Sequence, residues 1–232
     1  DLTRLMVGSE GTLGIITELT LRLYPIPEKI AGGTCSFPSI RAACDAVIET
    51  IQLGIPIARL EMLDPLHVRA CNAYSKLNLP ETPLLLVEFH GTSDSVEDDA
   101  ARFTDICDDH SPSPFHWSDD PDERNKLWKA RHDALWAAYA LIPGATGFAT
   151  DVCVPISRLA DCIEDTITDI EAAGLTAPIV GHVGDGNFHV LPLAMPDDID
   201  MHHKLSEFSG RLTARSLKLG GTCTGEHGIG QG

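Results

Sequence analysis

Two histidines flank a glycine-rich turn in the last quarter of the chain. His182 and His189 lie on either side of it, and the adjoining strands are expected to pair as far as Val183 and Phe188, with residues 184–187 as the hairpin loop. In that register the two histidines face each other on one side of the hairpin, with Cβ atoms about 5 Å apart. Their imidazoles would then be close enough to share one metal ion.

A third side chain is needed, because two imidazoles alone hold a divalent cation weakly. Glu226, near the C-terminus, is the carboxylate predicted to complete the set, and His227 would stand beside the ion as an acid/base group without binding it. The alternative is that the glycines only provide the positive φ that the turn requires and that the histidines bind nothing. A register slip of one residue would also separate the pair.

Arg131 is the second candidate, because it interrupts an apolar stripe. The stripe belongs to a helix predicted over residues 121–141, and Arg131 lies four residues from both Leu127 and Leu135. An inward-facing guanidinium must find an anion, either the carboxylate of a substrate or a buried Asp or Glu. The open alternative is an internal salt bridge, or an arginine whose stem packs while its head reaches solvent.

The elements that must position these groups fall into a short head and a long body. In the head, a glycine-rich turn precedes alternating residues from Thr17 onward, which predict a half-buried strand up to Leu23. Pro25 and Pro27 end it, because proline cannot donate to a sheet. We therefore expect two parts, residues 1–28 and residues 29–232. The missing initiator methionine leads us to expect the C-terminal part of a longer protein.

The body alternates strand-like and helix-like segments. Strands are predicted at residues 33–37, 58–63, 84–90, 115–118, 148–154, 179–183 and 187–193. Helices are predicted at residues 39–53, 65–75, 93–107, 121–141, 156–173 and 198–219. No glycine-rich dinucleotide turn is present in the body, so we expect an α+β fold with helices on one face of a largely antiparallel sheet.

Composition excludes several classes of function. The net charge of −17, from 17 basic and 34 acidic residues, argues against nucleic acid as a partner. The longest uncharged apolar run, residues 134–142, is too short to cross a bilayer. The 7 cysteines are scattered singly without a closely spaced pair, which is typical of reduced thiols in an intracellular protein.

Ordered motifs along the chain resemble a known flavoprotein family. Residues 7–17 resemble the end of the FAD-binding domain in the vanillyl-alcohol-oxidase-like flavoproteins, and the body resembles their FAD-linked oxidase C-terminal domain, a ferredoxin-like cap. Within that family, residues 127–132, 150–155, 182–189 and 225–230 look like the cytochrome-linked D-lactate dehydrogenases. The head would then be the C-terminal remnant of the FAD-binding domain.

The resemblance implies an FAD-dependent D-2-hydroxy-acid dehydrogenase and a role for each candidate residue. His182, His189 and Glu226 would bind Zn²⁺ or Mn²⁺. Arg131 would hold the substrate carboxylate, and His227 would remove the hydroxyl proton while the α-hydrogen leaves as hydride to the flavin. By the same matching, the FAD site would be lined by Glu10, Gly11, Thr12, Gly14 and Ile16.

The resemblance also bears on the substrate and partners. Relatives that oxidise D-2-hydroxyglutarate carry polar groups where this chain has Leu191 and Ala149, which favours a short apolar substrate such as D-lactate. The alternatives are a D-2-hydroxyglutarate dehydrogenase, a glycolate oxidase subunit, an alkyl-transferring synthase, or a cap module inactive without the missing FAD domain. Cytochrome c, a quinone or an electron-transfer flavoprotein would accept the electrons. The location would be mitochondrial in a eukaryote, or cytoplasmic or peripheral to the inner membrane in a bacterium.

Overall fold

The computed structural model describes residues 1–9 and 11–228. Within that part of the chain a seven-stranded sheet has the order β4-β1-β3-β2-β7-β8-β6, and its paired strands run antiparallel. A separate pair, β5 and β9, forms a small second sheet. The strands are β1 (Lys29–Ser36), β2 (Arg59–Leu63), β3 (Leu84–Gly91), β4 (His116–Ser118), β5 (Thr146–Gly147), β6 (Val152–Cys153), β7 (Ile179–Gly181), β8 (Asn187–Val190) and β9 (Leu193–Ala194).

Most helices begin where the sequence predicts, because their caps are local. Ser39, Asp64 and Thr92 each accept an N–H group from the first turn of the helix that follows. The helices are α1 (Leu2–Met6), α2 (Ile40–Gln52), α3 (Pro65–Ser75), α4 (Ser93–His110), α5 (Pro121–His132), α6 (Ala134–Ala140), α7 (Leu159–Ala173) and α8 (Ile199–Lys218), with short 3₁₀ turns η1 (Ile156–Arg158) and η2 (Val183–Asp185).

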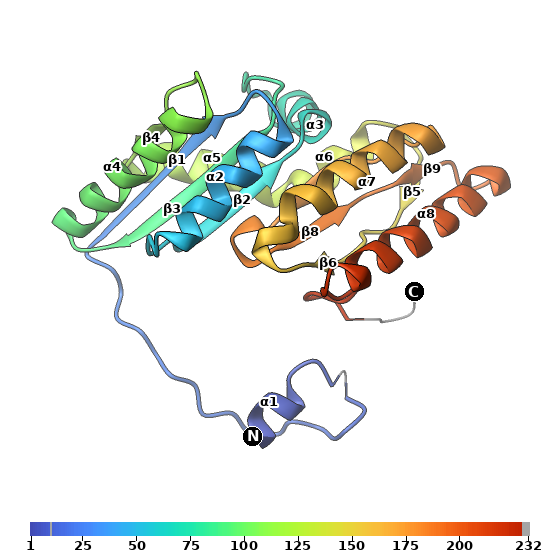
Figure 1. Cartoon of the computed structure of the whole chain (residues 1–232), viewed down its shortest axis with the longest axis horizontal. Helices are drawn as coiled ribbons and strands as arrows, with labels where there is room; N and C mark the ends of the chain where they lie inside the picture. The colour runs from blue at the N-terminus through green and yellow to red at the C-terminus, as the bar shows by residue number, and fades with distance from the viewer. Residues whose placement is uncertain (10, 229–232) are drawn as a thin grey trace.

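The α+β class with an antiparallel sheet is confirmed, but the helices cover both faces. Helices α2, α4 and α7 lie on one face of the long sheet, with α8 beside α7, whereas α3, α5 and α6 lie behind it (Figure 1). The expectation of helices on one face was therefore wrong. The reason is visible in β3, where every residue from Leu84 to Phe89 is buried, as happens when a strand has apolar neighbours on both sides.

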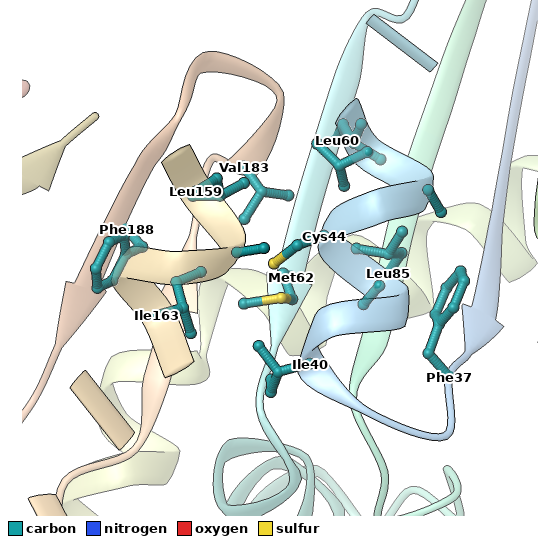
Figure 2. Packing of buried hydrophobic residues seen from close by; sticks show 14 of the residues in the cluster. Phe37, Ile40, Cys44, Leu60, Met62, Leu85, Leu159, Ile163, Val183 and Phe188 are labelled. Carbon is teal, nitrogen blue, oxygen red and sulfur yellow. The ribbon is translucent and has the colours of Figure 1, made fainter. Parts of the chain in front are cut away.

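The larger core lies between the sheet and the helices α2, α4, α7 and α8. In Figure 2, Cys44 of α2 and Ile163 of α7 point into the space between these helices and the strands, where Met62 and Phe188 lie. Each fully buried side chain of this size stabilises the fold by about 1.5–3 kcal/mol relative to its exposed state. This layer holds β2, β7 and β8 in a fixed relation to one another.

The smaller core lies on the opposite face. Leu63, Leu84 and Leu86 of the sheet meet Val68 of α3 and Trp128 of α5 there. A third cluster, around Ala138, Leu191 and Leu193, continues it towards the small second sheet. The apolar cover on this face is incomplete near β7 and β8, and the charged residues described below occupy that part of the face.

The single helix predicted over residues 121–141 is interrupted. Asp133 separates α5 from α6, and its carboxylate pairs with Lys129 at 2.6 Å. The break coincides with a tertiary contact: the imidazole Nε2 of His67 in α3 donates to the carbonyl of Ala134 at 3.0 Å. The strand predicted over residues 148–154 is likewise reduced to β6. Neither the contact between His67 and Ala134 nor the shortening of this strand can be seen in the periodicity of the sequence.

The strand predicted from Thr17 to Leu23 does not form. This part of the head runs as an extended chain away from the sheet (Figure 1), and Leu19, Leu21 and Leu23 are exposed. A strand needs a hydrogen-bonded neighbour, and none lies beside this segment within the described residues. None of the helices in the described part of the chain is long and apolar enough to span a membrane.

Candidate metal and substrate site

The hairpin that carries the two histidines has a different register from the predicted one. Val180, not His182, lies opposite His189, so the predicted pairing was wrong by two residues. Because side chains alternate with a period of two, this shift leaves both histidines on the same face. His182 follows the end of β7, and the centroids of the two rings are 5.7 Å apart.

The glycine at the hairpin turn has a structural reason of its own. Gly186 ends η2 with φ 78°, in the left-handed region, and a Cβ atom there would collide with the carbonyl oxygen of Val154. This part of the alternative interpretation is therefore correct, since the turn by itself requires the glycine. The loop runs over residues 182–186 and is thus one residue longer than the predicted loop, residues 184–187.

Glu226 reaches both histidines from the C-terminal segment. Its Oε1 lies 3.2 Å from Nε2 of His182 and 3.0 Å from Nε2 of His189. One ligand atom from each of the three residues lies within 4.8 Å of the other two. In a tetrahedral site with bonds of about 2.0–2.2 Å, neighbouring ligand atoms are about 3.4 Å apart, so the spacing suits a cation such as Zn²⁺.

Hydrogen bonds at the far side of each ring decide which nitrogen faces Glu226. Nδ1 of His189 lies 2.9 Å from the carbonyl oxygen of Thr150, and Nδ1 of His182 lies 2.6 Å from Glu61 Oε1. Both partners are acceptors, so each Nδ1 carries the hydrogen and each Nε2 presents a lone pair. Three lone-pair atoms thus converge, and a cation or a proton must neutralise them. The residues present therefore fit a divalent metal.

The two imidazoles have opposite electrostatic environments. The hydrogen bond to Glu61 raises the pKa of His182, whereas burial lowers the pKa of His189. His189 is only 6 % exposed, so burial destabilises its protonated form relative to its neutral form. A neutral imidazole is the form that binds a metal, and the buried histidine already favours it.

Asp151 holds the C-terminal segment in place. Its Oδ2 accepts the backbone N–H groups of Glu226 and His227, both at 2.7 Å, and its Oδ1 accepts from the amide of Asn187 at 2.8 Å. Burial acts to raise the pKa of Asp151, but these donors bring it below its usual value. The carboxylate therefore stays ionised and fixes the direction in which Glu226 and His227 leave the backbone.

His227 lies beside the cluster, as predicted for a group that does not bind the ion. Its ring stacks on that of His189, with centroids 4.7 Å apart and an interplanar angle of 4°. Its Nε2 is 3.4 Å from Glu226 Oε1. Asp151, His189 and His227 form a second possible ligand group. We favour the first group because the oxygens of Asp151 are already occupied by three donors.

Arg131 forms a salt bridge with a buried glutamate of this chain. Its Nε and Nη2 lie 3.0 and 2.9 Å from Oε2 of Glu61, so the internal salt bridge that the sequence left open is present. The other N–H groups of the guanidinium are not used in this pair. Arg131 also borders a cavity together with His182, His189, Glu226 and His227. It therefore stays a candidate for holding a substrate carboxylate.

Glu61 is the site residue that the sequence interpretation missed. It lies in β2, where Met62 pairs with Gly181 and Leu63 with Val180, so the next position along places Glu61 across from His182. The available signal was the alternation in β2, which puts Glu61 on the same face as Leu63 and therefore inside. A carboxylate that is 7 % exposed needs charged or hydrogen-bonding partners.

The cavity beside the cluster is small and has a largely apolar lining. Its volume is about 210 Å³, below the roughly 300 Å³ at which pockets for drug-sized ligands begin. Leu135, Ala149 and Leu191 contribute to its apolar wall, and the polar groups named above form the remainder. Both positions that the sequence singled out for substrate choice, 149 and 191, thus border it.

The residues predicted to contact FAD lie in the head, apart from this cluster (Figure 1). Gly11, Thr12, Gly14 and Ile16 are exposed, and Gly11 has φ 77° with open space where a side chain would stand. An exposed glycine turn fits close approach by another molecule, and the turn also requires the glycine by itself. Their cofactor contacts stay a prediction. Glu10 lies outside the described residues.

Comparison with known proteins identifies the family. The profile of the FAD linked oxidases, C-terminal domain, matches residues 26–232. The chain belongs to this family. A probable mitochondrial D-lactate dehydrogenase of Danio rerio is 50% identical over the whole chain, and the mitochondrial D-lactate dehydrogenase [cytochrome] of Arabidopsis thaliana is 40% identical. The glycolate oxidase subunit GlcD of Bacillus subtilis is 35% identical.

These relatives are longer proteins. The match covers 100% of this chain but 47% of the Danio rerio protein, 41% of the Arabidopsis thaliana protein and 49% of the Bacillus subtilis protein. The chain thus spans about half the length of the curated relatives it matches.

Two solved structures share the fold of this chain. An alkyldihydroxyacetonephosphate synthase superposes with a TM-score of 0.66 over 96% of this chain and 45% of its own, at 17% identity. A 4-ethylphenol oxidase from Gulosibacter chungangensis gives a TM-score of 0.65 at 16% identity, over 87% of this chain and 46% of its own. At such low identity these likenesses concern the fold alone.

Proposed function

We propose that the protein to which this chain belongs oxidises D-lactate to pyruvate with FAD as the electron acceptor. The observation that carries the proposal is the convergence of His182, His189 and Glu226 beside His227 and Arg131, at a small cavity with an apolar wall. That combination suits a short 2-hydroxy acid: a carboxylate, a hydroxyl to be deprotonated and a methyl group. The names of the relatives support the same substrate.

Two groups that the protein must bind would supply the rest of the chemistry. A divalent metal, Zn²⁺ or Mn²⁺, held by His182, His189 and Glu226, lowers the pKa of a bound hydroxyl group. FAD supplies the redox capacity, and the family description supports FAD as the cofactor. Residues 1–28 as the end of the FAD-binding domain and residues 29–232 as the cap are part of this proposal.

The side chains of this chain would divide the remaining tasks. Arg131 binds the substrate carboxylate through the N–H groups that Glu61 does not use, which orients the α-carbon. His227 accepts the hydroxyl proton, a step in which a positioned base contributes about 10²–10⁴-fold. Leu191 and Ala149 contact the methyl group and leave no partner for a second carboxylate.

Other members of the family define the alternatives. Glycolate lacks the methyl group, so a glycolate oxidase would not need the apolar wall formed by Leu191 and Ala149. D-2-hydroxyglutarate would place a second charge against that wall at a cost of several kcal/mol. A cap that does not turn over substrate by itself is the third alternative. The partner that takes the electrons from the reduced flavin would be cytochrome c, a quinone or an electron-transfer flavoprotein. The location in a eukaryote would be the mitochondrion, as in the names of the relatives.

A turnover assay on the full-length protein tests the proposal. D-lactate, glycolate and D-2-hydroxyglutarate are compared with an artificial electron acceptor, after the visible flavin spectrum has shown that FAD is bound. We expect kcat/KM to be highest for D-lactate, with D-2-hydroxyglutarate at least about 10-fold lower because its second carboxylate would be desolvated without a partner. A preference for glycolate or D-2-hydroxyglutarate would refute the substrate assignment, and no turnover despite bound flavin would refute the activity.

A further inference from the structure

Glu61 connects two parts of the site that would otherwise be independent. Its Oε1 accepts from Nδ1 of His182 at 2.6 Å, and its Oε2 accepts from Nε and Nη2 of Arg131 at 3.0 and 2.9 Å. The first partner belongs to the candidate metal cluster and the second to the candidate substrate clamp. The two oxygens of one buried carboxylate thus serve two different functional groups.

We propose that Glu61 is a positioning residue that sets the geometry of the metal cluster and of the anion clamp together. This inference rests on the proposed function and adds to it a residue that touches neither the metal nor the substrate. For His182, the bond to Oε1 keeps the hydrogen on Nδ1 and directs the lone pair of Nε2 towards Glu226. Without that acceptor the ring can rotate and present the wrong nitrogen.

For Arg131, the same carboxylate holds a long side chain in one conformation. An arginine side chain has many rotamers, and this freedom must be lost whenever the guanidinium binds an anion. Glu61 fixes Nε and Nη2, so the remaining N–H groups are already placed at the cavity wall. Preorganisation of this kind strengthens binding without adding a contact to the ligand.

A matched control lies on the neighbouring strand. Glu88 of β3 is also buried, at 4 % exposure, and it also pairs with a histidine and with arginines: His90 at 2.7 Å, Arg59 at 3.5 Å and Arg124 at 3.9 Å. It lies outside the cavity that the cluster borders. Replacement of Glu88 therefore disrupts buried ion pairs as replacement of Glu61 does, but none of its three partners borders that cavity.

The test compares Glu61→Gln with Glu88→Gln in the full-length protein. Glutamine has one carbonyl oxygen for the donors of two partners, and its NH₂ group faces whichever partner remains. Titration calorimetry gives the Kd for Zn²⁺ alone, and, separately on the metal-free protein, the Kd for propionate, which has the carboxylate and the apolar tail but no hydroxyl group. Thermal melts of each variant report folding.

We expect Glu61→Gln to weaken Zn²⁺ binding about 10–100-fold, as the loss of a partner behind a ligand does, and propionate binding several-fold, up to about 10-fold. Glu88→Gln should leave both Kd values within about 2-fold of the wild type while lowering the melting temperature. If Glu61→Gln does not fold, Glu61→Asp, which keeps the charge but is too short to reach both partners, should give the same two losses.

Several outcomes would overturn the inference, and they differ from a failure of the proposed function. Unchanged Zn²⁺ binding, or unchanged or tighter propionate binding, in the Glu61 variant would exclude the shared positioning role while leaving the dehydrogenase intact. Equal losses in the Glu88 variant would show a purely structural effect. A wild-type protein that binds no Zn²⁺ would refute the metal cluster and the positioning role together, whereas metal binding without turnover would refute only the activity.

Discussion

At the scale of single residues, each imidazole of the cluster has one nitrogen engaged with a protein acceptor. That engagement decides which nitrogen is free, because a carbonyl or carboxylate oxygen can only accept. His189 is the more restricted of the two histidines, since it is buried and bonded to Thr150. Within the described residues the ring of His227 has no such anchor, and its side chain is half exposed, so it is accessible to solvent.

The two histidines should therefore respond differently to replacement. In the full-length protein, His189→Ala should lose both bound metal and activity, because two ligands do not retain a divalent cation. His227→Ala should keep the metal and lose turnover by about 10²–10⁴-fold, the contribution of a positioned base. Elemental analysis and steady-state kinetics measure the two effects.

Equal metal content in wild-type protein and His189→Ala would contradict the ligand assignment. Loss of metal from His227→Ala would instead support the second group, formed by Asp151, His189 and His227. His203, an exposed histidine of α8 that lines neither the cluster nor its cavity, provides the control: His203→Ala should change neither quantity.

At the scale of elements, the C-terminal segment depends on α8 for its starting point. Asp169 of α7 forms ion pairs with Arg211 at 2.7 Å and with Arg215 at 3.1 Å, which fix α8 against α7. The chain then returns through a short bridge between Thr222 and Cys153 before Asp151 binds it. The ion pairs thus stabilise the scaffold of Glu226 at a distance from the site.

Asp169→Asn should lower the free energy of unfolding by about 1–2 kcal/mol near neutral pH, a range that allows for the partial exposure of Arg211. The hydrogen bond from Arg211 lowers the pKa of Asp169, with Arg215 adding to the effect. A depressed pKa means that the stabilisation is fully present above the unfolded value of about 4 and is lost as pH falls through the folded value. Urea denaturation of both proteins at several pH values measures this change.

The difference between Asp169→Asn and wild type should therefore shrink on acidification below pH about 4. A difference that grows towards low pH would contradict the assignment. Asp165, an exposed acid on the same helix, is the matched control, and Asp165→Asn should change stability by less than about 0.5 kcal/mol at any pH.

At the scale of the whole molecule, the body has its own cores and the head does not contribute to them. Two apolar clusters cover the two faces of the sheet, whereas none of residues 1–9 and 11–28 is buried. Several large apolar side chains of the head are exposed, among them Ile15, Leu23 and Ile26. The stability of the body should therefore be independent of the head.

Removal of residues 1–25 from this chain should shift the thermal midpoint by less than about 2 °C, because almost no buried surface is lost. Light scattering should also fall, since exposed apolar side chains promote association. Differential scanning calorimetry checks the first expectation. A midpoint lowered by more than about 5 °C would show that the head packs on the body.

Much of the local structure follows from the sequence, because its causes are local. The caps at Ser39, Asp64 and Thr92 and the prolines at the starts of α3 and α5 determine where helices begin. The residue types of the cluster, His182, His189 and Glu226, were likewise readable as a metal-binding set. Their ligand roles stay predictions.

The sequence by itself determined the α+β class, most element boundaries and the kinds of side chain available for chemistry, since these depend on neighbours a few positions away. Tertiary structure alone decided the register that sets Val180 opposite His189, the break at Asp133, the second helical layer and the pairing of Glu61 with both His182 and Arg131. Such contacts join residues up to 121 positions apart, as Glu61 and His182 are. Strand pairing and burial bring them together, and neither is visible in any short window of the chain.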